Sequence, residues 1–147
     1  MGKKIKEVMT RDVEVVGPTC GIREATQLMK ALDIGVLPVC DGNRLIGMVT
    51  DRDIALRVVA DGLDVNQSSV KQAMSSPVVY CYEDQDVEEA GHLMEVKQIR
   101  RLLVLDRDKN LAGVVSLGDI VVKTGREDLA GEILERVSEP KKDHSAA

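Results

Sequence analysis

The chain contains the same pattern twice, and this duplication constrains its fold more than any other feature. Residues 6–10 (Lys-Glu-Val-Met-Thr) recur 65 positions later as Lys-Gln-Ala-Met-Ser, and Leu37-Pro38-Val39 recurs as Leu102-Leu103-Val104. From Gly47 onward the spacing is 66, because the turn over 106–110 is one residue longer than the turn over 41–44. Turns tolerate insertions without disturbing the elements that they connect. Two homologous halves of one fold are therefore expected.

Each half predicts the order strand, helix, strand, strand, helix, which is a mixed α/β (α+β) fold class. Runs rich in β-branched residues predict strands over 13–16, 36–40 and 45–50, and over 78–81, 102–105 and 111–115. Apolar residues at helical spacing predict helices over 22–32, 51–60, 87–94 and 117–123. Thr19 and Asp84 precede the first helix of each half, where their side chains are placed to cap it.

These elements divide the chain into four parts. The first repeat is expected over 5–61, a polar linker over 62–69 and the second repeat over 70–124. Residues 125–147 are expected to form a C-terminal amphipathic helix and a tail. That helix is predicted over 126–137, with Leu129, Ile133, Leu134 and Val137 on one side, and residues 141–147 are expected to be frayed.

Composition excludes several classes of partner. The net charge is −5, whereas a nucleic-acid binder needs a basic face. The two tyrosines, with no Phe or Trp, disfavour recognition of single-stranded bases by stacking. No apolar run reaches the 18 or more residues of a membrane span, and no apolar stretch follows the basic N-terminus as in a secretory signal. We therefore expect neither a nucleic-acid nor a membrane partner.

The chemistry-bearing residues give no sign of an enzyme. Cys20, Cys40 and Cys81 are odd in number and lack a CxxC spacing, which favours a reducing cytoplasm over a disulfide framework. The two histidines, His92 and His144, are too few and too far from the cysteines to indicate a metal site. A P-loop, a GxGxxG motif and a nucleophile elbow are all absent from the sequence. No catalysis and no required cofactor are predicted.

Three segments in each half together resemble a known family. They are Val8-Met9-Thr10, Ile34–Val39 and Gly47–Ile54, with counterparts at Val70–Ser75, Ile99–Val104 and Gly113–Ile120. In this order and in duplicate they resemble the CBS domain, and the pair resembles a Bateman module of the small stand-alone bacterial kind. The resemblance implies tandem CBS repeats packed with pseudo-two-fold symmetry, a homodimer, and clefts between the repeats that bind adenosine-containing ligands such as AMP, ADP or ATP.

Thr50-x-x-Asp53 and Ser116-x-x-Asp119 are the candidate ligand-binding pairs. Each is also a simple helix-capping arrangement, and both roles can coexist. A carboxylate can accept hydrogen bonds from both hydroxyls of a ribose, and a helix N-terminus offers N–H groups to a phosphate. The resemblance implies that the aspartate holds the ribose, while the hydroxyl residue contacts the polar end of the ligand.

The remaining candidates surround these pairs. Arg100 and Arg101 stand where the family places basic residues against phosphate, although a solvated pair is the alternative. Gly35 and Val36 occupy those positions in the first half, where Arg52 is the nearest candidate cation unless it pairs with Asp51. By resemblance, Val13, Ile34 and Val114 form an apolar slot near Asp119, and Val78, Ile99 and Met48 form one near Asp53. Leu103 departs from the family pattern, which Pro38 keeps.

The resulting hypothesis is a regulatory sensor module that binds an adenosine derivative. The alternative is a protein-protein interaction module, with an unidentified protein partner, in which the ligand sites are vestigial. In that case the two motifs are only helix caps, and replacing Asp53 or Asp119 changes stability by a capping-sized amount.

Overall fold

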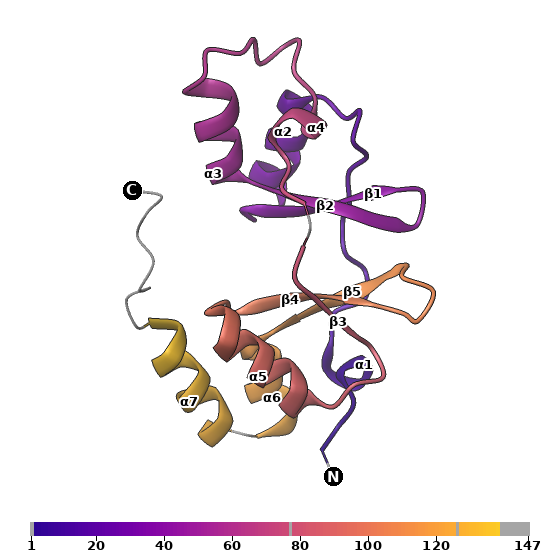
Figure 1. The fold of residues 1–147 in the computed structure, drawn as a ribbon, viewed down its shortest axis with the longest axis vertical. Coiled ribbons are helices and arrows are strands. Elements are labelled where there is room, and N and C mark those ends of the chain that lie inside the picture. The colour runs from indigo at the N-terminus through magenta and orange to yellow at the C-terminus, as the bar shows by residue number, and fades with distance from the viewer. Residues whose placement is uncertain (1, 77, 126, 139–147) are drawn as a thin grey trace. The chain divides into compact units, whose positions relative to one another are not determined.

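The structure, a computed structural model, describes residues 2–76, 78–125 and 127–138. It divides into two compact units (Figure 1). Of the described residues, unit 1 contains those within 2–11, 80–106 and 112–138, and unit 2 those within 12–79 and 107–111. Neither unit coincides with a sequence repeat, because the first residues of each repeat belong to the unit that is built mainly from the other. The tail expected over 141–147, with His144, lies outside the described residues.

Unit 2 contains a β-hairpin with two helices packed against it. The elements are α2 (Ile22–Leu32), β1 (Val36–Asp41), β2 (Arg44–Thr50), α3 (Asp51–Ile54), a π-helical turn η1 (Ala55–Val59) and α4 (Val70–Ala73). Strands β1 and β2 are antiparallel, with Val36 opposite Thr50. An isolated parallel bridge joins Val16 to Val39 on one edge, and an antiparallel bridge joins Met48 to Ser75 on the other.

Unit 1 repeats this plan and adds a helix. Its elements are α1 (Ile5–Val8), β3 (Tyr80–Tyr82), α5 (Val87–Lys97), β4 (Arg101–Leu105), β5 (Leu111–Ser116), α6 (Leu117–Thr124) and α7 (Glu127–Ser138). The sheet order is β3-β4-β5, with β3 parallel to β4. Thr10 pairs with Val114 of β5, as Ser75 pairs with Met48 of β2. In each unit, the segment that precedes one repeat thus pairs with the sheet of the other repeat. We call these segments, residues 3–10 in unit 1 and 68–75 in unit 2, the exchanged segments.

Each exchanged segment is held at the C-terminus of its short helix by a basic side chain. Lys123 Nζ of α6 donates to the carbonyl of Val8 at 2.8 Å. Arg57 of η1 donates to the carbonyls of Ala73 and Met74, both at 3.0 Å. Arg57 and Lys123 are equivalent in the duplication, so both units use one device to satisfy carbonyls that a helix leaves unpaired.

The exchanged segments also cap the first long helix of each unit. The N–H of Ile22 donates to Ser68 O and the N–H of Val87 to Lys3 O, both at 3.0 Å. The prediction that Thr19 and Asp84 cap these helices is therefore wrong. The N-cap residues are Gly21 and Asp86, neither of which makes a side-chain cap bond, because backbone from the exchanged segment satisfies the N–H groups.

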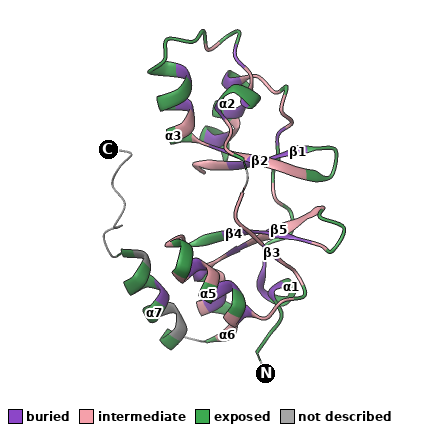
Figure 2. Ribbon diagram, in the orientation of Figure 1, coloured by how far each residue is buried: buried purple, intermediate pink, exposed green. Residues whose placement is uncertain are grey.

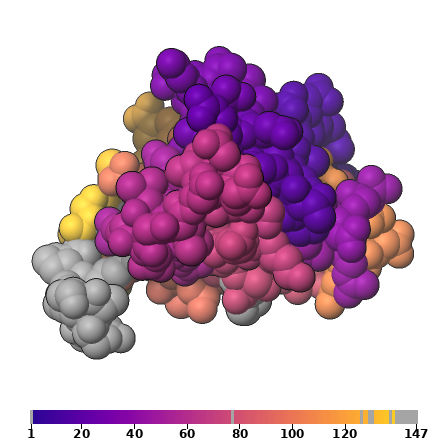
Figure 3. Space-filling model, turned by 90° about the horizontal axis from the view of Figure 1, so that it is seen from above, coloured from indigo at the N-terminus to yellow at the C-terminus, as the bar shows by residue number. Residues whose placement is uncertain are grey.

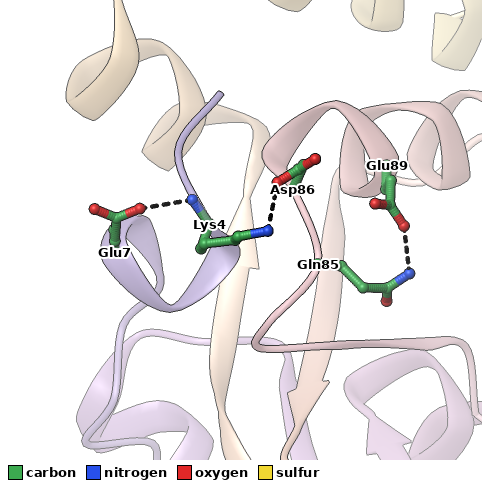
Figure 4. A network of polar contacts seen from close by, with 5 residues as sticks. All are labelled: Lys4, Glu7, Gln85, Asp86 and Glu89. Carbon is green, nitrogen blue, oxygen red and sulfur yellow. Dashed lines mark hydrogen bonds and ion pairs between the residues drawn. The ribbon is translucent and has the colours of Figure 1, made fainter. Parts of the chain in front are cut away.

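Polar contacts on the surface of unit 1 accompany this exchange (Figure 4). Lys4 Nζ lies 3.0 Å from a carboxylate oxygen of Asp86, and its backbone N–H donates to Glu7 at 2.7 Å. Gln85 donates to Glu89 at 2.7 Å. The hydrogen bond to Asp86 raises the pKa of the exposed Lys4 amine. Exposed pairs of this kind stabilise a fold only slightly, so the free energy of folding of unit 1 owes little to them.

Aliphatic side chains fill both cores, as expected from a chain without Phe or Trp. The core of unit 2 is formed by Val16, Ile22, Ala25, Met29, Leu37, Val39, Val49, Ile54, Val58, Val70 and Ala73. Equivalent positions in unit 1, including Val87, Met94, Leu102, Val104 and Ile120, are also buried. Both cores draw on the exchanged segments, through Val70 and Ala73 in unit 2 and Ile5 and Val8 in unit 1.

The hairpin strands and the helices after them agree with the sequence prediction, but the first strand of each half does not. Residues 13–15 are not in a strand and only Val16 forms a bridge, while the second strand begins at Tyr80 rather than at Val78. The C-terminal helix is present as α7, with Ile133 buried and Leu134 exposed. The side chains of Leu129 and Val137, and residue 126, lie outside the description.

Candidate functional site

The two hydroxyl–carboxylate pairs have the same geometry at the start of the last helix of each unit. The Asp53 N–H donates to Thr50 Oγ1, and the Thr50 N–H donates back to Asp53 Oδ2, both at 3.0 Å. The Asp119 N–H donates to Ser116 Oγ at 3.0 Å, and the Ser116 N–H donates to Asp119 Oδ2 at 2.9 Å. These are reciprocal capping boxes. All four residues are half-buried, so each carboxylate is fixed while still within reach of solvent.

The cap bonds use only one oxygen of each carboxylate. Among the described residues, no hydrogen bond is found for Oδ1 of Asp53 or of Asp119. A carboxylate oxygen offers two acceptor positions. Each pair therefore presents a rigidly held acceptor that can receive donors from a bound molecule without giving up its capping bond.

The residue that enters the first hairpin strand lies beside each pair. In unit 2 the Asp51 N–H donates to Gly35 O, and in unit 1 the Leu117 N–H donates to Arg100 O, both at 2.9 Å. A Cβ atom at Gly35 would lie 2.9 Å from the Asp51 carboxylate, so a side chain at that position would have to displace it. The structure thus brings Gly35 to Thr50 and Asp53, and Arg100 to Ser116 and Asp119.

The candidate cations differ in their surroundings. Arg100 and Arg101 are exposed, and neither forms an ion pair within the described part of the chain. Arg52 is also exposed. Its backbone N–H donates to Asp51 Oδ1 at 2.8 Å, but no ion pair between the two side chains is found among the described residues. Three guanidinium groups therefore face water and are available to an anionic ligand.

The predicted apolar residues are all half-buried, namely Val13, Ile34, Met48, Val78, Ile99 and Val114. Met48 and Val114 occupy equivalent positions, each paired through its backbone with the exchanged segment of its own unit. The slots implied by the resemblance, Val13 and Ile34 with Asp119, and Val78 and Ile99 with Asp53, combine residues of the two units, and they stay predictions.

Sequence reasoning missed Thr10 and Ser75 as candidate site residues. Each exchanges two backbone hydrogen bonds with the residue two positions before the hydroxyl of a pair: Thr10 with Val114, and Ser75 with Met48. In each unit, a second residue with a hydroxyl group therefore lies opposite the strand that leads into the pair. The signal was available in the repeat itself, because Met9-Thr10 and Met74-Ser75 recur at equivalent positions.

The cysteines are not equipped for nucleophilic chemistry. All three are free, and burial raises the pKa of each thiol, that of Cys81 to about 12. A reactive cysteine needs the opposite shift. Within the described residues, no three His, Cys, Asp or Glu side chains are grouped to hold a metal ion, and no helix has the length and apolar character needed to cross a membrane.

Comparison with known families decides the identity of the duplicated unit. The family model of the CBS domain matches twice, over residues 5–60 and 70–124. The chain belongs to the CBS-domain family. Proteins built from a pair of such domains are regulatory modules. The stand-alone members of the family are generally regulatory rather than catalytic.

Small proteins of the same size are among its relatives. The CBS domain-containing protein YhcV of Bacillus subtilis is 42% identical over 134 residues, which cover 91% of this chain and 94% of that protein. Hypoxic response protein 1 of Mycobacterium tuberculosis is 35% identical over 116 residues, or 78% of this chain and 80% of the relative. Its crystal structure, with two coordinated zinc ions, has a TM-score of 0.73 at 34% identity, covering 82% of this chain and 98% of that one.

A more distant structure carries a nucleotide. CBSX2 in complex with AMP has a TM-score of 0.72 at 24% identity, covering 86% of this chain and 99% of that one. At this identity the likeness shows the shared fold.

Proposed function

We propose that this CBS pair is a non-enzymatic sensor that binds an adenosine-containing ligand of the AMP, ADP or ATP class, with Asp53 and Asp119 as the ribose-binding groups. The observation that carries the proposal is the duplicated hydroxyl–carboxylate pair, in which capping leaves Oδ1 of each aspartate to accept donors. The hydrogen bonds that the two vicinal hydroxyls of a ribose donate to one carboxylate are charge-assisted, because the acceptor is ionised. The AMP complex of CBSX2 supports the choice of ligand class.

The proposal assigns the other candidates by their position. Thr50, Arg52, Met48, Val78 and Ile99 complete the site of Asp53. Gly35, whose carbonyl accepts the N–H of Asp51, also belongs to the site of Asp53, and Ser116, Arg100, Arg101, Val114, Val13 and Ile34 complete that of Asp119. The proposed assembly is a homodimer and the proposed setting is the cytoplasm, where the three free thiols would stay reduced.

Thermal unfolding with and without nucleotide tests this function. A ligand that binds only the folded state stabilises it by about 2.7 kcal/mol at one hundred times its dissociation constant. We expect AMP, ADP or ATP to raise the Tm, and Asp119→Ala to remove most of the gain. If adenine nucleotides at millimolar concentration leave the Tm of the natural chain unchanged, the proposal is wrong.

Glu7→Ala is the matched control for the loss of a cap. Glu7, like Asp119, is a carboxylate in the first turn of a helix, and it accepts the backbone N–H of Lys4 at 2.7 Å. Its replacement costs about 1 kcal/mol of capping energy and leaves the nucleotide response intact. If Asp119→Ala only lowers the Tm as Glu7→Ala does, with the full nucleotide response retained, the protein-interaction alternative is favoured.

A further inference from the structure

The C-terminal helix packs on the helical side of unit 1. Helix α7 contacts both α5 and α6, and Ile133 in its middle is completely buried. Figure 2 shows α7 alongside these helices, with its exposed positions in green. In Figure 3 the yellow atoms of α7 are visible at the surface, and Leu134 is 45% exposed. The described part of α7 therefore docks through one face and leaves the other face in solvent.

Two side chains from the C-terminal end of α5 bind Arg136 of α7. The Arg136 guanidinium lies 3.3 Å from a carboxylate oxygen of Glu95. The side-chain amide of Gln98 donates to the carbonyl of Arg136 at 3.2 Å. Arg136 lies in the last turn of α7, where carbonyls have no partner within the helix, so this bond caps α7. The ends of α5 and α7 are thus fixed to each other.

The backbone of Gln98 has a left-handed conformation. Its φ is 56° and its ψ is 47°, a region that costs conformational energy for a residue other than glycine. The equivalent position in unit 2 is Asp33, which is also left-handed, with a φ of 54°. Aspartate tolerates this region because its short polar side chain can hydrogen-bond locally. The longer side chain of Gln98 instead reaches α7, so in unit 1 a contact with another helix offsets the cost.

The residues after Gln98 connect this contact to the candidate phosphate site. The N–H of Ile99 donates to a carbonyl of α5 at 3.0 Å, and the carbonyl of Arg100 accepts the N–H of Leu117 at 2.9 Å. Leu117 begins α6 and directly follows Ser116 of the hydroxyl–carboxylate pair. The three residues from Gln98 to Arg100, which we call the connecting segment, are therefore bonded in turn to α7, α5 and α6. The backbone of Arg100 is held by α7 at one end of this segment and by the candidate site at the other.

Unit 2 has neither feature at the matching place. The residues equivalent to the two that bind Arg136 are Lys30 and Asp33, and they line an open cavity of about 290 Å³ rather than a docked helix. Gly35 stands in the place of Arg100 and has no side chain to offer to a phosphate. Among the described residues, the docked helix and the arginine beside the hydroxyl–carboxylate pair thus occur together in the same unit.

We propose that α7, through Gln98, positions Arg100 to bind a phosphate group of the ligand, so that docking of α7 and binding of a phosphate-bearing nucleotide strengthen each other. This inference rests on the proposed function and deepens it, because it names an element that regulates the Asp119 site. The physical reason is preorganisation: a segment that one partner has already ordered loses less conformational entropy when it binds a second. The coupling is reciprocal, so the nucleotide also stabilises the docked helix.

Gln98→Gly tests whether the contact with α7 acts on ligand binding and not on folding alone. Glycine adopts the left-handed conformation readily but cannot reach α7, so the chain should still unfold cooperatively while its connecting segment is less ordered. Calorimetric titration should show ATP bound about fivefold more weakly or worse, as is typical of coupled sites. The affinity for adenosine, which has no phosphate, should be unchanged.

Asp33→Gly is the matched control, because it makes the same kind of change at the equivalent left-handed position of unit 2. Asp33 is not bonded to a helix equivalent to α7 among the described residues, and Gly35 carries no cation that it could position. The affinities of this variant for ATP and for adenosine should both equal those of the natural chain.

A second variant loosens the contact from the side of α7. Ile133→Asp places a charge in the buried face of the helix, should detach it, and should weaken ATP binding by the same factor as Gln98→Gly. The double variant should show no further loss, because the second change removes a contact that is already lost. Hydrogen exchange gives the reciprocal measurement: ATP should slow exchange of the α7 amides in the natural chain, whereas adenosine should not.

Four outcomes would overturn the inference and leave the ligand-binding proposal standing: full ATP affinity in Gln98→Gly, an equal loss of affinity for adenosine, additive losses in the double variant, or α7 amides that exchange equally fast with and without ATP. A natural chain that binds neither ATP nor adenosine would contradict the proposed function, and this inference with it. The titration of the natural chain therefore distinguishes the two failures.

Discussion

Burial sets the chemistry of individual side chains in this protein, and Cys81 shows it most clearly. Its side chain lies in β3, is 3% exposed, and has Sγ 3.7 Å from the carbonyl oxygen of Leu103. Removal from water penalises the thiolate and raises the pKa of the thiol from 9.0 to about 12. The thiol consequently stays protonated throughout the physiological range and acts as a small apolar group.

This shift predicts a loss of stability in alkali. The unfolded chain releases the Cys81 proton near pH 9, whereas the folded chain holds it to about pH 12. The folded state binds more protons in this window, so the free energy of unfolding falls as the pH rises, by about 1.4 kcal/mol per unit. Urea titrations between pH 8 and 11 should show this slope in the natural chain and a shallower slope in Cys81→Ala. Equal slopes in the two proteins would contradict the prediction.

Among the elements, the exchanged segments impose the strictest steric condition. Thr10 pairs with Val114, and the neighbouring Gly113 has no side chain to hold the segment away. A Cβ at position 113 would overlap the carbonyl oxygen of Thr10, and a Cβ at the equivalent Gly47 would lie 2.9 Å from that of Ser75. Backbone oxygens in a bridge cannot move aside cheaply, so glycine is required at both positions.

We therefore expect Gly113→Ala to destabilise the protein by about 1–3 kcal/mol, the usual cost of overpacking. Gly131→Ala is the control. Gly131 lies within α7, where an added Cβ meets no atom within 4 Å, and the substitution should stabilise the helix by about 1 kcal/mol. Chemical denaturation of both variants measures the difference. A Gly113→Ala chain as stable as the natural one would show that the exchanged segment can shift.

At the scale of the whole molecule, the two units are alike in plan but unequal in charge beside their sites. Arg100 and Arg101 are exposed next to the Ser116–Asp119 pair, whereas unit 2 has Gly35 and Val36 at those positions. Guanidinium groups match phosphate oxygens in geometry and charge. The proposed sensor should thus distinguish ligands by the number of their phosphates at one site and much less at the other.

The double variant Arg100→Gln/Arg101→Gln tests this asymmetry. Calorimetric titration should show ATP binding weakened by about tenfold or more for the loss of two charged hydrogen bonds, with adenosine binding nearly unchanged. The ATP effect should shrink at high salt, because exposed charges are screened. Lys6→Gln/Arg23→Gln removes the same net charge elsewhere and should leave both affinities unchanged. An equal loss of affinity for ATP and for adenosine would contradict the proposed role of these arginines in phosphate binding.

Local signals in the sequence predicted the elements that depend on local order. The hairpin strands, the helices that follow them and the Thr50–Asp53 and Ser116–Asp119 pairs could be found because hydrophobic period and capping motifs act over a few residues. The caps of α2 and α5 could not, because their N–H groups bond to backbone of Ser68 and Lys3, far away in sequence. The strand predicted over residues 13–15 is absent for a related reason, because β-branched residues form a strand only where the edge of another strand lies beside them.

The exchange of segments also orders events during synthesis. Residues 12–79 contain nearly all of unit 2, so that unit can close early. Residues 2–11 are synthesised before the rest of unit 1, yet Thr10 pairs with Val114, and the Val8 carbonyl accepts a hydrogen bond from Lys123. More than a hundred further residues must therefore be synthesised before this segment can make those contacts and complete its unit.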